Sequence, residues 1–265
     1  MEYTNSPMVV YTKLSPNHSG QRTHSIDRIT PHCVVGQCTA EGLGEWFAKS
    51  STQASSNYGI DRDGRVAMYV EEKNRSWCSS SNANDQRAVT IECASDTKEP
   101  YAFRDIVYKT LVKLCVDICK RYDKSKLLWL EDKDKTLAYE PKPEEMILTV
   151  HRWFANKSCP GNWMFARMGD LAEKVTAILE GRFESVDDLK DVSSLTTTTP
   201  FLVKVNIDNL NIRKGPGTSY ERTQFIPVGV YTIVEVKSGA DSVAGWGRLC
   251  SGAGWISLDY CNKLS

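Results

Sequence analysis

Two histidines and one cysteine have types and spacing that could bind a metal ion. His151 and Cys159 lie eight residues apart with Lys157 between them, and His32 and His151 each end a predicted strand. Imidazole nitrogen and thiolate sulfur both bind Zn²⁺, and three protein ligands with one open position are typical of catalytic zinc. Zinc would lower the pKa of bound water from about 15.7 to about 7, which creates a nucleophile at neutral pH. On spacing alone, ordinary packed histidine and cysteine residues explain the pattern equally well.

The elements that would position these residues follow from the hydrophobic periodicity. Apolar residues recur every three or four positions over 103–122 and again over 164–178, which predicts two helices, the second ending near Gly181. The segments Arg65–Val70, Ala88–Cys93 and Met146–Val150 are rich in β-branched residues and predict strands of a mixed sheet. Residues 1–181 are therefore predicted to form an α/β domain with a mixed central sheet flanked by helices.

Four segments in the first 181 residues carry a resemblance to a known family. They are Ile29–His32, Ser56–Val66, Val89–Glu92 and Thr149–Gly161, the last of which contains His151, Lys157 and Cys159. In this order the sequence resembles the zinc-dependent N-acetylmuramoyl-L-alanine amidases of the bacteriophage lysozyme and peptidoglycan recognition protein superfamily, the type-2 amidases. The likeness spans about residues 25–180.

The resemblance implies a role for each residue of the site. Zn²⁺ would be held by His32, His151 and Cys159. Glu92 would be the general base, and Lys157 would stabilise the oxyanion together with the metal. Solvated strand and loop positions are the alternatives for Glu92 and Lys157.

Three further residues are expected in the same cleft. Tyr58 would be an oxyanion donor or would orient a ligand, and Trp77 and Asn57 would contact the substrate.

Some cysteines depart from the family pattern. Many relatives have histidine where this chain has Cys33 and Cys78, which alters the expected pocket wall without removing a zinc ligand. Cys33 could compete for the metal, but adjacent strand side chains point to opposite faces. Cys115 and Cys119 lie four apart on a predicted helix and are expected to be buried thiols.

The C-terminal residues 201–265 predict a small all-β domain. Short β-type runs alternate with glycine clusters, which is typical of a small barrel. This part resembles the bacterial SH3-type domains of cell-wall hydrolases, which implies a wall-binding module. The residues expected to contact the wall are Asn211, Arg213, Tyr220, Trp246 and Trp255, with a core position as the alternative for the tryptophans. The acidic, Ser/Thr-rich segment 182–200 is predicted to be a linker.

Composition limits the possible partners. The chain has 33 Lys and Arg against 33 Asp and Glu, so it has no net field that would attract nucleic acid or an anionic membrane. It has no apolar run long enough for a membrane span and no secretory signal at its start, so we expect cytoplasmic synthesis without membrane insertion. Nine cysteines, an odd number, argue against a disulfide scaffold.

These observations predict a two-domain peptidoglycan hydrolase of the endolysin or autolysin type. It would cleave the amide between N-acetylmuramic acid and the L-alanine of the stem peptide. A phage enzyme of this kind would reach the wall after release, with the help of a holin. The alternatives are a noncatalytic peptidoglycan-binding protein and a zinc endopeptidase of the stem peptide, although no HExxH helix supports the endopeptidase.

Overall fold

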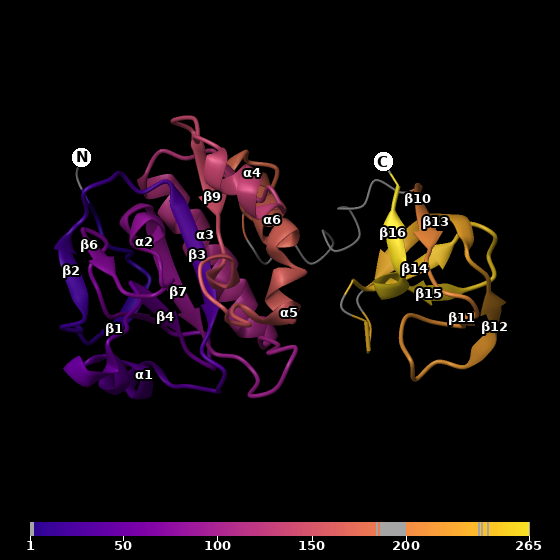
Figure 1. Cartoon of the computed structure of the whole chain (residues 1–265), viewed down its shortest axis with the longest axis horizontal. Coiled ribbons are helices and arrows are strands. Elements are labelled where there is room, and N and C mark those ends of the chain that lie inside the picture. The colour runs from indigo at the N-terminus through magenta and orange to yellow at the C-terminus, as the bar shows by residue number, and fades with distance from the viewer. Residues whose placement is uncertain are drawn as a thin grey trace. The chain divides into compact units, whose positions relative to one another are not determined.

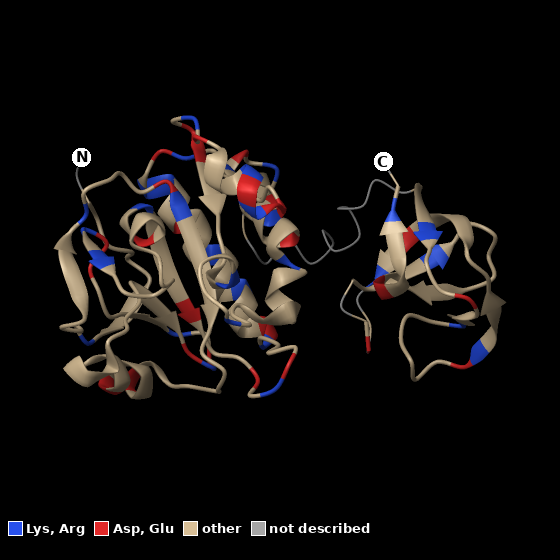
Figure 2. Ribbon diagram, viewed as in Figure 1, with Lys and Arg blue, Asp and Glu red and all other residues tan. Residues whose placement is uncertain are grey.

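The chain divides into two compact units, residues 1–186 and 187–265 (Figure 1). The computed structural model describes residues 3–183, 185, 200–237, 239, 241–242 and 244–264. Most of the predicted linker 182–200 lies outside these residues. Basic and acidic residues are interspersed along the ribbons of both units (Figure 2). None of the described helices is long and apolar enough to cross a bilayer.

The first unit is built on a seven-stranded mixed sheet of order β1-β5-β4-β7-β3-β9-β8. Its strands are β1 (Val9–Thr12), β3 (Arg28–Cys33), β4 (Tyr58–Ile60), β5 (Val66–Met68), β7 (Ala88–Cys93), β8 (Lys126–Leu128) and β9 (Glu145–Leu148). Within this sheet β4 and β5 pair antiparallel, and the other neighbouring strands run parallel. A separate ribbon pairs β2 (His18–Gln21) with β6 (Asn74–Ser76).

The central strands β3 and β7 are covered on both faces, as expected for parallel strands inside an α/β domain. The helices of the unit are α1 (Ala40–Phe47), α2 (Asn82–Arg87), α3 (Asp105–Arg121), α4 (Lys133–Ala138), α5 (Gly161–Phe165) and α6 (Met168–Leu179). Helix α3 contacts β4 and α6, and α6 contacts β8. The buried residues of helix α1 pack on Ala67 of β5. Ala67 is in register with Gly59 of β4, and Gly59 is in register with Glu92 of β7.

The predicted α/β fold is confirmed, and one helix differs from its predicted extent. The expected helix over 164–178 is two helices, α5 and α6, separated by a turn at Ala166 and Arg167. The Arg167 N–H donates to the carbonyl of Met164, three residues back, while the Arg167 guanidinium donates to the carbonyl of Trp163 at 3.0 Å. The side chain thus occupies the carbonyl that a continuous helix would pair with the Arg167 N–H, and the helix breaks there.

The second unit is all-β, as predicted. Its strands are β10 (Phe201–Val205), β11 (Leu210–Arg213), β12 (Arg222–Ile226), β13 (Gly229–Lys237), β14 (Trp246–Leu249), β15 (Trp255–Ser257) and β16 (Cys261–Lys263). They pair antiparallel in the order β12-β11-β15-β14-β13-β10-β16. Aliphatic residues form a core within this unit: Val203, Val205, Leu210, Ile212, Ile226, Ile233, Leu249 and Ile256.

Candidate active site

His32 and Glu92 are brought together by the register of two parallel strands. His32 is the penultimate residue of β3, and Glu92 holds the same place in β7, directly opposite it. Residues in register on neighbouring strands point to the same face of a sheet. Both side chains therefore project from one face, at the carboxyl ends of the two strands, where ligands commonly bind in α/β folds.

His151 and Cys159 belong to one loop at the same edge of the sheet. His151 begins a short 3₁₀ turn, His151–Trp153, three residues after the last residue of β9. The Arg152 N–H donates to the carbonyl of Cys159 at 3.0 Å, and this bond closes the loop. The loop thus turns the Cys159 thiol back toward the strands.

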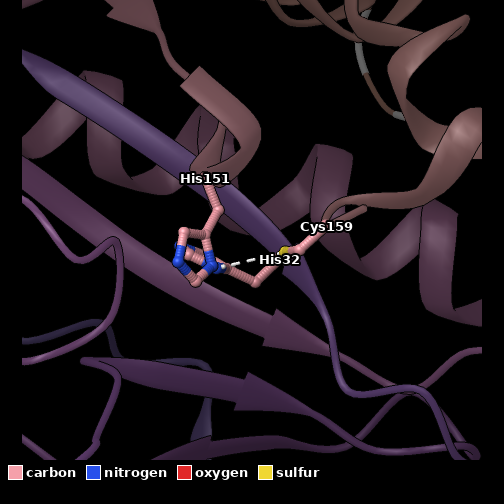
Figure 3. A group of neighbouring side chains, drawn as sticks. All are labelled: His32, His151 and Cys159. Carbon is pink, nitrogen blue, oxygen red and sulfur yellow. Dashed lines mark hydrogen bonds between the residues drawn. The ribbon is translucent and has the colours of Figure 1, made fainter. Parts of the chain in front are cut away.

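The side chains of His32, His151 and Cys159 converge (Figure 3) and are called the ligand triad below. One ligand atom from each lies within 4.8 Å of the others, with His32 Nδ1 3.3 Å from Cys159 Sγ. The two imidazole rings are 5.1 Å apart between centroids. Two imidazoles and one thiol at these separations fit Zn²⁺, and an ion there would keep an open fourth position.

The surroundings hold both imidazoles in the neutral form that binds metals. Burial, and then the neighbouring His151, lower the pKa of His32 well below its usual value. Burial, and then the charge of Lys157, lower the pKa of His151. Burial raises the pKa of the Cys159 thiol, so the thiolate needs a cation beside it to form at neutral pH.

Two serine hydroxyls that the sequence analysis did not single out orient the imidazoles. Ser79 Oγ lies 3.3 Å from His32 Nε2, and Ser80 Oγ lies 3.0 Å from His151 Nε2. Asn84 of α2 donates to Ser79 Oγ at 3.2 Å. Such outer contacts fix the orientation of metal-binding imidazoles. The run of three serines after Trp77-Cys78 was the only signal in the sequence, and its composition indicates no more than a loop.

Glu92 is placed to handle a proton beside the ligand triad. It is partly buried, and its Oε1 accepts a weak hydrogen bond from Cys78 Sγ at 3.8 Å. Its Oε2 is buried and has no hydrogen-bond partner among the described residues. Burial raises the pKa of Glu92 to about 7.

A cleft of about 550 Å³ opens beside the triad. Trp77, Lys157, His151 and Cys78 line it, so the structure places Trp77 and Lys157 at the same cleft as His151. Trp77 Nε1 donates to Ser19 Oγ at 2.7 Å, which fixes the indole ring. Lys157 is exposed beside the cleft, where its ammonium group can meet a ligand.

Tyr58 does not line this cleft, which corrects the expectation from the sequence. It is in register with Ile91, one position before Glu92, so its side chain leaves the opposite face of the sheet. The hydroxyl donates to Glu72 Oε1 at 2.5 Å and accepts from the Ser6 N–H at 2.8 Å. Tyr58 is therefore part of a buried polar cluster and not of the site.

Asn57, which was expected to contact the substrate, does not lie at the cleft either. Its side chain is fully buried, and its amide donates to the carbonyls of Val70, Glu71 and Asn74. Its Oδ1 accepts from the Arg22 guanidinium and the Thr90 N–H. With its hydrogen bonds made inside the fold, Asn57 has no group left for a ligand.

The residues of the second unit that were expected to contact the wall differ in their exposure to solvent. Trp246 and Trp255 are 2% and 7% exposed, so both are buried and neither offers a flat surface. Tyr220 is 48% exposed. Arg213 donates to the carbonyls of Thr218 and Tyr220 and so braces the loop that carries the tyrosine, while Asn211 in β11 is partly buried.

Comparison with known proteins gives one family match. Residues 22–162 match the family model described as N-acetylmuramoyl-L-alanine amidase, and this range contains the ligand triad, Glu92 and Lys157. No curated protein matches the chain.

Several solved structures align with the first part of the chain at low sequence identity. The Staphylococcus aureus hydrolase AmiA aligns with a TM-score of 0.50 at 12% identity, over 69% of this chain and 89% of its own. N-acetylmuramoyl-L-alanine amidase LysC from Clostridium intestinale has a TM-score of 0.39 at 16% identity, covering 68% and 95%. A mutant endolysin from Bacillus subtilis has a TM-score of 0.42 at 13% identity, covering 62% and 97%. At these identities, the likeness to AmiA indicates a shared fold and nothing further.

Proposed function

The chain belongs to the N-acetylmuramoyl-L-alanine amidase family, and we propose that it cleaves its peptidoglycan amide with a zinc ion held by His32, His151 and Cys159. The bond is the one between N-acetylmuramic acid and the L-alanine of the stem peptide. The observation that carries the zinc assignment is the convergence of three ligand atoms within 4.8 Å of one another at the edge of the sheet.

Each side chain has a role that its position supports. Bound zinc would supply Lewis-acid chemistry toward the carbonyl oxygen and lower the pKa of water. Glu92 is in register with His32, and no donor among the described residues satisfies its buried Oε2, so Glu92 would accept a proton and return it to the departing amine.

Lys157 and Trp77 would act on the substrate from the cleft wall. The Lys157 ammonium would stabilise negative charge that develops on the carbonyl oxygen. Trp77, held by Ser19, would give the substrate an apolar surface to lie on. Ser79 and Ser80 would keep the two imidazoles oriented throughout.

We further propose that the second unit binds the cell wall and that the whole chain acts as an endolysin. The exposed Tyr220, together with Phe225 at 50% and Val230 at 54% exposure, offers apolar surface on this small β unit. A wall-binding unit would raise the local concentration of enzyme at an insoluble polymer. We also propose that a holin helps the enzyme to reach the wall.

Digestion of purified peptidoglycan tests the reaction. We expect new L-alanyl amino termini without new reducing sugar ends, and we expect a chelator to abolish them until Zn²⁺ is restored. Fragments that retain the muramyl–alanine bond but are cut at a peptide bond within the stem peptide would identify an endopeptidase instead. Release of neither product, with wall binding retained, would identify a noncatalytic binder.

A further inference from the structure

A thiol that the ligand triad does not use lies beside Glu92. Cys78 follows β6, and its N–H is held by Asp85 Oδ2 of α2 at 3.1 Å. This bond directs the side chain toward the sheet, where Sγ lies 3.8 Å from Glu92 Oε1. Cys78 also lines the cleft, so an ion from solvent can reach it.

Cys78, Glu92 and His32 form a second set of metal-ligating groups. One ligand atom from each lies within 4.8 Å of the others. Zinc bonds to sulfur, nitrogen and oxygen are about 2.0–2.3 Å long, which puts tetrahedral ligand atoms roughly 3.3–3.8 Å apart. The three groups therefore need to close by at most about 1.5 Å to hold an ion.

Glu92 supplies independent evidence that this position can take a ligand. Its Oε2 is buried, and among the described residues no donor satisfies it. A buried carboxylate oxygen without a donor is unfavourable, and a cation relieves that cost. Thiolate, carboxylate and imidazole together are a donor set that suits Zn²⁺.

We propose that Cys78, Glu92 and His32 form a second zinc-binding set, which fills when zinc is in excess and inhibits the amidase. The inhibitory part rests on the proposed role of Glu92, whereas the binding part does not. When Glu92 holds a cation through its carboxylate, it can no longer accept a proton. Cys78 releases its thiol proton to solvent as the ion binds.

The second ion binds more weakly than the first because the two sets share His32. His32 Nδ1 faces Cys159, and Nε2 faces Ser79. The imidazole can serve two ions only after losing its remaining ring proton. Until it does so, the second ion depends on Cys78 and Glu92 alone.

Equilibrium dialysis of the full chain tests the binding. Metal-free protein is dialysed against rising Zn²⁺ or Cd²⁺, the bound ions per chain are counted by elemental analysis, and thiolate–Cd²⁺ charge-transfer absorbance is followed. We expect two ions on the wild type, and one ion with a weaker thiolate band on Cys78→Ser and on Cys78→Ala. Cys250→Ser is the matched control, because Cys250 is an exposed thiol of the second unit, and it should keep two ions. A single ion on the wild type, or a second ion retained by both Cys78 variants, overturns the proposal.

A rate measurement against free Zn²⁺ tests the inhibition. Each variant is compared with its own maximal rate. We expect Cys78→Ser to need at least about tenfold more zinc than the wild type for half inhibition. Losing a direct ligand should lower the affinity for the second zinc at least as much as losing an outer contact would. Inhibition at the same zinc concentration in both proteins overturns the inhibitory part. If neither the wild type nor any variant hydrolyses peptidoglycan, the proposed function fails. The dialysis experiment still shows whether Cys78, Glu92 and His32 bind a second ion.

Discussion

At the scale of single residues, the site depends on which protonation states burial favours. Burial makes His32 and His151 neutral and ready to bind a metal, but it also opposes ionisation of Cys159. A cation must therefore offset the cost of the buried thiolate. We therefore expect zinc binding to depend strongly on Cys159.

Replacing Cys159 with alanine should remove zinc and activity together. The metal loses its anionic ligand and keeps two neutral ones, so zinc content after dialysis should fall well below one ion per chain. Elemental analysis and release of L-alanyl amino termini measure the two effects. Cys250→Ser should change neither, because this thiol is exposed in the second unit. Full zinc and full activity in Cys159→Ala would contradict the ligand assignment.

Replacing Glu92 with glutamine should separate catalysis from metal binding. The amide nearly preserves the shape of the side chain but cannot accept a proton, so the rate should fall at least about 10²-fold while the first zinc is retained. Amidase kinetics and zinc analysis on the same sample check this. A rate within a few-fold of the wild type would remove Glu92 from the mechanism.

Tyr58→Phe should affect stability and leave the amidase rate unchanged. The substitution removes a hydroxyl that donates to the buried Glu72 carboxylate and accepts from the Ser6 N–H. The loss should lower the free energy of unfolding by about 1–3 kcal/mol, as for a hydrogen bond to a charged group. Urea denaturation and peptidoglycan kinetics measure the two quantities. A large drop in rate at full stability would return Tyr58 to the catalytic site.

At the scale of elements, parallel strands and two loops form the site. Strands β3 and β7 set His32 opposite Glu92, the loop after β9 carries His151 and Cys159, and the loop before α2 carries Ser79 and Ser80. Asp85 of α2 fixes this last loop by accepting from the N–H groups of Cys78 and Ser79 at 3.1 and 3.0 Å. A short helix thus holds the hydroxyls that orient the imidazoles.

Asp85→Ala should weaken zinc binding from a position that does not touch the ligand triad. Two backbone N–H groups lose their acceptor, so we expect the free energy of unfolding to fall by about 1–3 kcal/mol and zinc affinity to fall about 10- to 100-fold. Competition with a chromophoric chelator and thermal unfolding measure these changes. Gln86→Ala is the control and should leave zinc affinity unaltered. Gln86 is the next residue of the same helix, and its side chain accepts a hydrogen bond from the Thr23 N–H instead of holding the loop. Equal zinc affinity in Asp85→Ala and the wild type would show that the loop needs no such anchor.

At the scale of the whole molecule, each unit has its own core. The aliphatic core of the second unit is formed by residues within 203–256, and the site lies within residues 32–159 of the first unit. Separate cores allow one unit to be removed without unfolding the other.

Removing residues 187–265 should leave hydrolysis of a soluble muropeptide unchanged. Lysis of intact walls should fall by about 10²-fold, because the second binding event no longer raises the local enzyme concentration. Parallel assays on the two substrates test this. An equal loss on both substrates would mean that the second unit supports the catalytic unit directly and does not serve as a tether.

The sequence by itself predicted some of the regular elements and the candidate ligand types. Periodicity identified α3, because its apolar face must be buried whatever the rest of the fold does, and β-branched content identified the strand Ala88–Cys93. It missed the break between α5 and α6, because that break comes from the contact of the Arg167 side chain with Trp163, which periodicity does not encode. The residue types of His32, His151 and Cys159 are compatible with zinc, and the family resemblance turned that possibility into the prediction of a zinc site.

Only the tertiary structure decided which polar residues face the cleft. The family resemblance placed Tyr58 and Asn57 in the cleft with Glu92. Strand register puts Tyr58 on the opposite face of the sheet, and the hydrogen bonds of Asn57 are made inside the fold. The loop between β6 and α2 brings Cys78, 14 positions before Glu92, against its carboxylate. A linear motif states which groups are near one another along the chain. The face on which each group emerges depends on pairing between distant strands, and that pairing exists only in the folded molecule.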